Sequence, residues 1–253
     1  MAIAPLDAPG GKTGEPGLPV LAHREEIAAA LRQGNALILC APPGTGKSTQ
    51  VPLFFLDRPG RVLVLQPRRI AARNLALRVA EELGEPVSAT VGYQVRFEGK
   101  SGEGTRILYQ TYGVFFQQLL GDPFLRGVGT VILDEFHERG LEADASLAWL
   151  KRLRATDRPD LGLAVMSATL ETDELRSYWS APPSTGLTVL EVAAQAYPVE
   201  ISHQPPLAQE PLGTQAARAL KRLLAQGLSG SALVFMPGRG EIRRVLEDRK
   251  SVG

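Results

Sequence analysis

Five short apolar runs recur along the chain, and they constrain its fold more than any other feature of the sequence. Uninterrupted runs of this length are typical of strands that are buried on both faces, as in a parallel sheet covered by helices. The runs occupy residues 36–40, 61–66, 105–110, 130–134 and 161–166. Segments with helical periodicity separate or flank them, at residues 23–33, 70–84, 113–120 and 141–153. This alternation predicts an α/β fold with a mostly parallel sheet and helices on both faces.

The composition is that of an ordinary globular protein. Of 253 residues, 44% are hydrophobic and 22% are charged, and the formal net charge is +1. These values exclude a disordered tail, a collagen or a coiled coil, and they argue against a general polyanion-binding surface. The single cysteine, Cys40, excludes an intramolecular disulfide and a cysteine-based zinc site. No apolar run reaches the roughly 18 residues of a membrane span, and residues 1–17 lack the apolar segment of a secretory signal. We therefore expect a cytoplasmic protein without a membrane partner.

Proline-rich stretches divide the chain into segments. Residues 1–17 predict a flexible leader, and residues 18–195 predict one large domain. Residues 196–253 contain a helical segment at 214–226, another apolar run at 232–236, which predicts a strand, and the start of a further helix. This order predicts the incomplete start of a second α/β domain. So short a segment buries little surface, and we expect it to be the least stable part of the chain.

The residues that follow the first apolar run have the pattern of a phosphate-binding loop. In Ala41-Pro-Pro-Gly-Thr-Gly-Lys-Ser48, small residues let backbone N–H groups turn toward phosphate oxygens. Lys47 would reach the β- and γ-phosphates of ATP, and the Ser48 hydroxyl would bind Mg²⁺. An ordinary glycine-rich turn is the alternative. The candidate ATP ligands in this loop are Pro43, Gly44, Thr45, Gly46, Lys47, Ser48 and Thr49.

An acidic pair closes the fourth apolar run. In an open parallel sheet, ligands bind beyond the carboxyl ends of the strands, so Asp134 and Glu135 would face the phosphate loop. Asp134 suits a Mg²⁺ role through water, because Mg²⁺ takes few carboxylates and keeps several waters. Glu135 suits polarising an attacking water. A solvated acidic turn is the alternative, and His137 by itself is more typical of a turn than of a catalytic site.

Three motifs in this order resemble those of the DEAH/RHA helicases of superfamily 2, and in particular the bacterial HrpB-type ATP-dependent helicases, which also carry Phe in the acidic box. The motifs are residues 44–48, 134–137 and 167–169. The supporting segments are residues 66–73, 78–82, 91–98, 134–140, 166–170, 235–238 and 240–242. The resemblance spans about residues 20 to 247. It implies a RecA-like P-loop NTPase domain followed by the truncated start of a second one. It also implies ATP and Mg²⁺ as cofactors, and a helicase or translocase that acts on single-stranded nucleic acid, with RNA favoured over DNA.

The resemblance also implies individual roles. Lys47, Asp134, Glu135 and His137 would be catalytic, with His137 linking the ATP site to the rest of the motor. Arg78 would stack on the adenine ring as a planar cation on a π face. Ser167, Ala168 and Thr169 would couple hydrolysis to strand movement, although such a segment by itself is also typical of a polar turn and helix cap. The implied nucleic-acid contacts are Arg68, Arg69, Arg96 and Thr111, which suit sequence-independent phosphate binding.

Two departures from the family pattern stand out. Tyr112 occupies a position where relatives usually have Glu, and it could offer a stacking surface to a base. The second-domain segment Gln-x-x-Gly-Arg-x-Gly-Arg, which supplies arginine fingers in the family, is absent. An arginine finger is worth on the order of 10³–10⁵ in rate. We therefore expect weak MgATP binding and slow hydrolysis by this chain. We also expect the native protein to contain the C-terminal helicase domain that is missing here. In addition, we expect residues 248–252 not to continue the preceding helix and the native reading frame to differ after Glu247.

Two alternatives to a helicase remain open. A P-loop small-molecule kinase would use the same phosphate loop, but it should carry a lid and an acceptor pocket, and Ser167-Ala-Thr169 would have no role in it. An ATP-binding half-motor without turnover would keep every motif named above. Stimulation of hydrolysis by RNA would separate a helicase from a kinase.

Overall fold

The computed structural model describes residues 17–32, 34, 36–169, 172–181, 186–193, 199–205, 210–227 and 230–248. The chain divides into two compact units, residues 1–195 and 196–253, and each is described by itself. The predicted leader lies outside the described residues except for Gly17. Among the described residues, no helix has the length and apolarity needed to cross a membrane.

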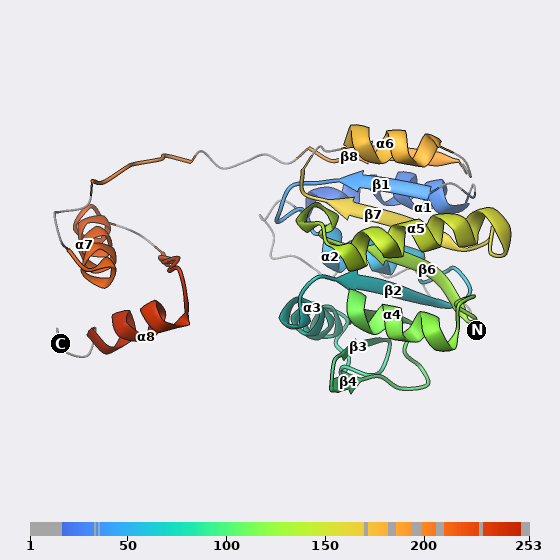
Figure 1. Cartoon of the computed structure of the whole chain (residues 1–253), viewed down its shortest axis with the longest axis horizontal. Helices are drawn as coiled ribbons and strands as arrows, with labels where there is room; N and C mark the ends of the chain where they lie inside the picture. Colours follow the sequence, from blue (N-terminus) through green and yellow to red (C-terminus); the bar gives the residue numbers. More distant parts are fainter. Residues whose placement is uncertain are drawn as a thin grey trace. The chain divides into compact units, whose positions relative to one another are not determined.

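The first unit is built on one eight-stranded sheet of order β4-β3-β5-β2-β6-β7-β1-β8 (Figure 1). Its strands are β1 (Ala36–Cys40), β2 (Arg61–Gln66), β3 (Val91–Val95), β4 (Glu98–Lys100), β5 (Ile107–Thr111), β6 (Val128–Leu133), β7 (Gly162–Ser167) and β8 (Leu187–Glu191). All neighbouring strands pair in parallel except β3 and β4, which form an antiparallel hairpin. The predicted α/β fold with a mostly parallel sheet is confirmed.

Helices cover both faces of this sheet, and each face has its own core. One core receives α1 (Arg24–Arg32), α3 (Arg69–Glu82) and the 3₁₀ helix η2 (Val51–Phe55). The opposite core receives α4 (Tyr112–Gly121), α5 (Leu141–Thr156) and α6 (Thr172–Ser180). Alternate side chains of β1 enter opposite cores, with Leu37 in the first and Ile38 in the second. Burial on both faces explains why the inner strands appear as continuous apolar runs.

The strands that the sequence did not predict belong to the edge regions of the sheet. Every residue of β4 is exposed, and β8 is mostly half-buried. In β3, Gly92 and Gln94 separate the apolar residues from one another. Because a strand near a sheet edge needs no continuous apolar run, its sequence resembles that of a loop.

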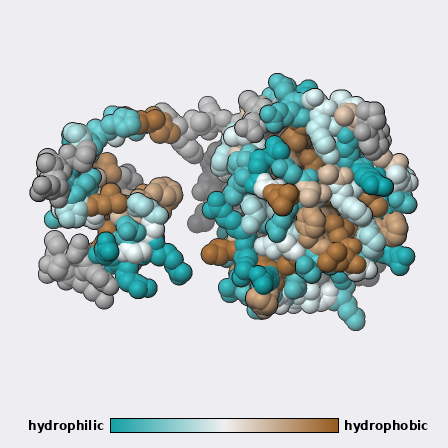
Figure 2. All heavy atoms as spheres, viewed as in Figure 1, coloured by the Kyte–Doolittle hydropathy of each residue, from teal (hydrophilic) through white to brown (hydrophobic). Residues whose placement is uncertain are grey.

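The described residues of the second unit form two helices, α7 (Leu212–Ala225) and α8 (Arg239–Asp248). Asp248 continues α8, so the expectation that the helix stops before residue 248 is wrong at this position. The predicted strand at 232–236 is wrong, because these residues have no regular structure and Leu233 and Phe235 are 80% and 86% exposed. Exposed apolar residues are found elsewhere in this unit too, and Figure 2 shows brown atoms on its surface. A strand requires a hydrogen-bonding neighbour, and the described part of this unit contains no other strand. The start of a second RecA-like domain remains a prediction.

The loop between α5 and β7 fixes the segment that enters β6. The guanidinium of Arg158 donates to the carbonyl oxygens of Phe124 at 2.7 Å, and of Leu125 and Val128 at 2.8 Å each. A planar guanidinium can serve several fixed acceptors at once, whereas an ammonium on a flexible stem cannot match them all. Arg158 therefore ties the start of β6, and with it the strand that carries the acidic pair, to the rest of the sheet.

We predict that Arg158→Lys lowers the free energy of unfolding by about 2 kcal/mol, because carbonyl oxygens of the 124–128 segment lose a charged donor. Urea denaturation followed by circular dichroism measures the change. Arg152→Lys, an exposed position on the same helix α5, is the matched control and should have little effect. Equal stabilities for the two variants would contradict the role assigned to Arg158.

Candidate nucleotide-binding site

Three predicted motifs meet at the carboxyl edge of the sheet. The phosphate loop follows β1, the acidic pair follows β6, and Ser167-Ala-Thr169 follows the end of β7. These strands are consecutive in the order β6-β7-β1, and Cys40 lies opposite Ser167 in the register. The backbone N–H of Ala41 donates to the carbonyl of Ser167 at 3.0 Å. The sheet therefore brings together residues that are far apart in the sequence.

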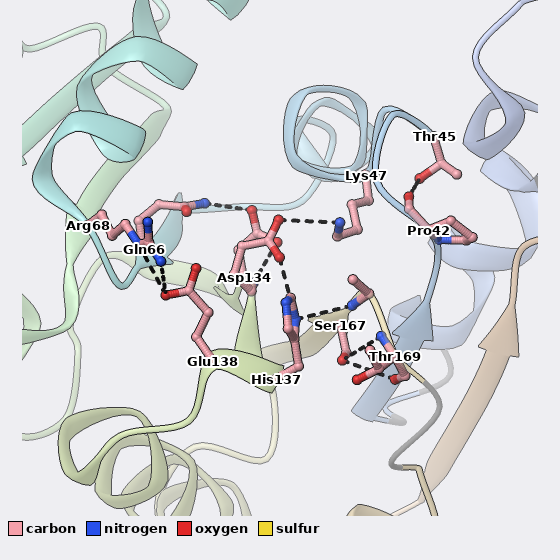
Figure 3. Close-up of polar contacts among 12 residues, drawn as sticks. Pro42, Thr45, Lys47, Gln66, Arg68, Asp134, His137, Glu138, Ser167 and Thr169 are labelled. Atoms are coloured by element: carbon pink, nitrogen blue, oxygen red, sulfur yellow. Dashed lines mark hydrogen bonds and ion pairs between the residues drawn. The ribbon is translucent and has the colours of Figure 1, made fainter. Parts of the chain in front are cut away.

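The phosphate loop adopts a backbone that depends on its glycines. Gly44 and Gly46 have φ angles of +81° and +88°, in the left-handed region that favours glycine. At Gly46 a Cβ would also lie 2.8 Å from Leu18 Cδ1. The hydroxyl of Thr45, which is buried, donates to the Pro42 carbonyl at 2.8 Å and closes the loop (Figure 3). The loop is thus held in one conformation by its own residues and by the segment packed behind it.

Lys47 joins the phosphate loop to the acidic pair. Its side chain is only 5% exposed, and its Nζ lies 3.3 Å from Oε1 of Glu135. A buried ammonium is costly unless it is paired, and Glu135 provides the opposite charge. The same ammonium is the group expected to bind phosphate oxygens.

Asp134 is fully buried at the end of β6. Gln66 Nε2 donates to its Oδ2 at 2.6 Å, and the Glu135 backbone N–H donates to its Oδ1 at 2.9 Å (Figure 3). Burial raises the pKa of Asp134, and the charge of Glu135 adds to this rise, while hydrogen bonds from Ser48 and Gln66 and the charge of Lys47 oppose it. Asp134 is therefore a carboxylate whose negative charge is only partly compensated within the described structure.

His137 connects the acidic pair to the segment after β7. Its Nδ1 lies 3.3 Å from the backbone nitrogen of Ala168 and 3.5 Å from Oε2 of Glu135 (Figure 3). An unprotonated Nδ1 accepts from Ala168, whereas a protonated Nδ1 donates to Glu135, so one nitrogen cannot make both hydrogen bonds at once. The Ser167 hydroxyl donates to the Thr169 carbonyl at 3.1 Å. The Thr169 backbone N–H in turn donates to Ser167 Oγ at 3.3 Å. The segment that His137 contacts is therefore a compact turn.

The residues present fit a magnesium nucleotide. A hydroxyl from Ser48 and a carboxylate from Asp134 are oxygen ligands of the kind that Mg²⁺ prefers. Gln66 Oε1 is buried and accepts no hydrogen bond in the described structure, so it can accept one from a metal-bound water. Among the described residues, no group of three His, Cys, Asp or Glu side chains forms a metal site by itself. Mg²⁺ bound with the phosphates of a nucleotide requires no such group.

Comparison with known proteins identifies the family. Residues 22–177 match the DEAD/DEAH box helicase family. The chain belongs to this family. It is 43% identical over 237 residues to the ATP-dependent RNA helicase HrpB of Escherichia coli. The alignment covers 92% of this chain and 29% of that protein. It is also 34% identical to the ATP-dependent RNA helicase HrpA homolog of Haemophilus influenzae, over 91% of this chain and 18% of that protein.

A solved structure gives the same result. The crystal structure of the Escherichia coli DEAH/RHA helicase HrpB superimposes with a TM-score of 0.84 at 43% identity, over 92% of this chain and 30% of that one. The predicted resemblance to DEAH/RHA helicases, and to HrpB in particular, is confirmed, as is the RecA-like α/β fold. The chain spans less than a third of the length of these relatives.

Arg78, the predicted adenine-stacking residue of this helicase-family chain, lies on α3 with its side chain 61% exposed. Its Nε donates to Glu82 Oε1 at 2.7 Å. The other oxygen of Glu82 accepts from Gln50 at 2.9 Å, at the end of the helix α2 (Lys47–Gln50) that follows the phosphate loop. The Glu82 carboxylate thus connects Arg78 to the end of the helix that follows the phosphate loop. Its contact with adenine remains a prediction.

The predicted nucleic-acid contacts lie in two places. Arg68 and Arg69 follow β2 and Thr111 ends the neighbouring strand β5, where Gln66 and Thr111 are paired in register. Arg68 is paired with Glu138 at 3.2 Å, whereas Arg69 is exposed at the start of α3. Arg96 lies apart from these, in the β3–β4 turn, with its guanidinium 4.8 Å from the ring centre of Phe97.

Tyr112 corrects one expectation from the sequence. It is only 4% exposed, packs in the second core, and donates its hydroxyl to the Asp134 carbonyl at 3.2 Å. The prediction that Tyr112 offers a stacking surface to a base is therefore wrong. Sequence reasoning also missed Gln66 as a partner of Asp134, although a polar side chain at the end of a buried apolar run was a usable signal.

We predict that Asp134→Asn stabilises the chain by about 1 kcal/mol at pH 7 in the absence of nucleotide. Because the pKa of Asp134 is raised in the folded chain, its ionised form disfavours folding at neutral pH. This penalty disappears once the pH falls below the pKa that the Asp134 carboxyl has in the unfolded chain. The gain should therefore be smaller at pH 4 than at pH 7. Thermal or urea unfolding at both values measures it, with exposed Asp57→Asn as the control. A gain of the same size at both values would contradict the assignment.

Proposed function

We propose that this chain is the nucleotide-binding part of an ATP-dependent RNA helicase, in which residues 18–195 bind MgATP and couple its hydrolysis to movement along single-stranded RNA. The observation that carries the proposal is the contact of Lys47 with Glu135 at 3.3 Å, beside buried Asp134. In this contact the phosphate-binding loop and the acidic pair lie side by side, so a phosphate bound at the loop would lie next to the carboxylates. The names of the relatives, which are ATP-dependent RNA helicases, favour RNA.

In the proposed reaction, Lys47 exchanges partners. Phosphate oxygens bound at the loop compete for its ammonium and release the carboxylate of Glu135, which then accepts a hydrogen bond from the attacking water. Ser48 and, through water, Asp134 would hold Mg²⁺, which would neutralise charge at the phosphates. His137 lies against Glu135 and Ala168, so a change at Glu135 is transmitted to residues 167–169. This contact supports their proposed coupling role.

Single-stranded RNA would bind along the ends of β2 and β5. Thr111 ends β5, and Arg69 begins α3 just after the neighbouring strand β2. We propose that these two residues offer a hydroxyl and a cation to the RNA backbone. Arg68 would exchange Glu138 for phosphate, much as Lys47 exchanges Glu135. Arg96 is proposed as a more distant contact. Because these contacts involve backbone phosphates, binding should depend strongly on salt and weakly on sequence.

Two alternatives are less well supported. A small-molecule kinase does not account for residues 167–169 or for membership in the helicase family. A half-motor that binds ATP without turnover differs from the proposal only in rate. The 253 residues contain no Gln-x-x-Gly-Arg-x-Gly-Arg segment, so we propose that this chain alone hydrolyses ATP slowly and depends on a C-terminal helicase domain for full activity.

We predict opposite effects for the two partners of the ion pair. Lys47→Ala should weaken binding of a fluorescent ATP analogue in Mg²⁺ by more than about tenfold, because a charge-assisted contact with phosphate is lost. Glu135→Gln should bind at least as tightly as the unsubstituted chain, because it removes the carboxylate that competes for Lys47. Its single-turnover hydrolysis should fall by about 10²–10⁴-fold.

Exposed Lys100→Ala controls for the loss of a positive charge. Normal nucleotide affinity in Lys47→Ala, or unchanged single-turnover hydrolysis in Glu135→Gln, would contradict the proposed roles. Comparing hydrolysis with and without single-stranded RNA in the unsubstituted chain tests the choice of a helicase over a kinase.

We predict that Arg69→Ala weakens binding to a single-stranded RNA of mixed sequence by about three- to tenfold at moderate salt. The slope of log affinity against log salt should become shallower by about 0.7, the value for one phosphate contact on a single strand. Fluorescence anisotropy over a salt series measures both quantities. Arg152→Ala, an exposed arginine on α5, is the matched control. An unchanged slope would remove Arg69 from the RNA contact.

A further inference from the structure

Two tyrosines at the end of β5 donate to backbone carbonyls on the two sides of the nucleotide site. Tyr109 lies in β5 and in the first core, and its hydroxyl donates to the Ser48 carbonyl at 2.8 Å. Tyr112 follows the strand, lies in the second core, and donates to the Asp134 carbonyl at 3.2 Å. Both side chains are almost fully buried. The carbonyls that they contact belong to the two residues proposed to hold Mg²⁺.

The Ser48 carbonyl needs a donor from outside its own helix. In a regular helix it would accept from the backbone nitrogen four residues later, but that residue is Pro52, which has no N–H. The preceding carbonyl, of Lys47, is satisfied in the ordinary way by Val51. Because a buried carbonyl without a donor is costly, the Tyr109 hydroxyl replaces the missing N–H. It thereby fixes the backbone from which the Ser48 hydroxyl projects.

The Asp134 carbonyl precedes a strained residue. Glu135 has a φ of +50°, which a non-glycine residue adopts only when its surroundings hold it there. The peptide between Asp134 and Glu135 is held at both ends, since Tyr112 donates to its carbonyl and its N–H donates to Asp134 Oδ1. Burial, together with the charge of Asp134, raises the pKa of both tyrosines well above the ordinary value, so each hydroxyl keeps its proton as a donor.

Thr111, a proposed RNA contact, lies between the two tyrosines in the sequence. It is also paired in register with Gln66, whose side chain donates to Asp134. Three separate hydrogen bonds therefore connect this end of the β5–β2 pair to the proposed Mg²⁺ ligands. A shift of the strand end on RNA binding would act on both ligands.

We propose that Tyr109 and Tyr112 are positioning residues that fix Ser48 and Asp134 for magnesium and make binding of the magnesium nucleotide sensitive to RNA at Thr111. This inference rests on the proposed function. It differs from a packing role, because each ring would fill its core equally well without its hydroxyl. Tyr→Phe substitutions isolate that difference, since they remove one oxygen and keep the ring.

The test compares Tyr109→Phe and Tyr112→Phe with Tyr93→Phe in the 253-residue chain. Tyr93 lies opposite Tyr109 in the register, is equally buried, and donates to Glu98 at the far hairpin. Affinity for a fluorescent ATP analogue is measured in Mg²⁺ and in EDTA, with and without single-stranded RNA. Each site variant should bind about three- to tenfold more weakly in Mg²⁺ and unchanged in EDTA. Tyr112→Phe should also reduce the effect of RNA, and Tyr93→Phe should change none of these values.

A rescue variant sharpens the test for Tyr109. Pro52→Ala restores a backbone N–H four residues after Ser48, so the double variant Tyr109→Phe/Pro52→Ala should recover part of the lost affinity in Mg²⁺. A thermal unfolding curve for every variant checks that the variant is folded.

Three outcomes would overturn the inference, and they are distinguishable. If the unsubstituted chain binds no nucleotide in Mg²⁺, the proposed function fails and the inference fails with it. If the site variants bind like Tyr93→Phe, the proposed function stands and the positioning role is wrong. If affinity falls equally in Mg²⁺ and in EDTA, the tyrosines act only through general stability.

Discussion

The ion pair between Lys47 and Glu135 connects the strand ends on which the candidate site is built. The two residues follow β1 and β6, which are not neighbours, because β7 lies between them. Lys47 is almost fully buried, so its charge must be balanced nearby, and Glu135 is the carboxylate within 3.3 Å. The His137 contact with Ala168 adds the end of β7 to the same group. Charge balance in a buried place therefore fixes the relative position of three loops.

This arrangement also explains why a strained residue persists. A φ of +50° at Glu135 costs on the order of 1–3 kcal/mol and requires compensation from the surrounding contacts. Lys47 holds the side chain, Asp134 accepts from the backbone N–H, and Tyr112 holds the preceding carbonyl. A ligand that competes for Lys47 removes one of these three restraints and leaves two in place. The carboxylate can then move while its backbone stays fixed.

The sequence predicted the inner strands and the motif residues better than the contacts between them. The strands β1 and β2 are buried on both faces, and their predicted bounds match the structure to the residue, while those of β5, β6 and β7 differ by one or two residues. The edge strands β4 and β8 carry no such signal. The motif residues followed from strand ends that parallel pairing must bring to one edge. Gln66 as the partner of Asp134 depends on β2 lying beside β6, and strand order cannot be derived from a single chain. The run at 232–236 is apolar, but no described strand of its unit pairs with it.

Tyr112 shows how packing decides the role of a position within a motif. A carboxylate here would lie at a cavity of about 240 Å³ that is already lined by Glu135, Glu138 and Glu142. The phenol instead brings a neutral donor and a ring that fills the second core. Because Tyr112, the first residue of α4, is only 4% exposed, its ring is not available to stack on a nucleic-acid base. Tyr112 therefore supports the acidic pair from within the core, and the proposed RNA contact falls to its neighbour Thr111.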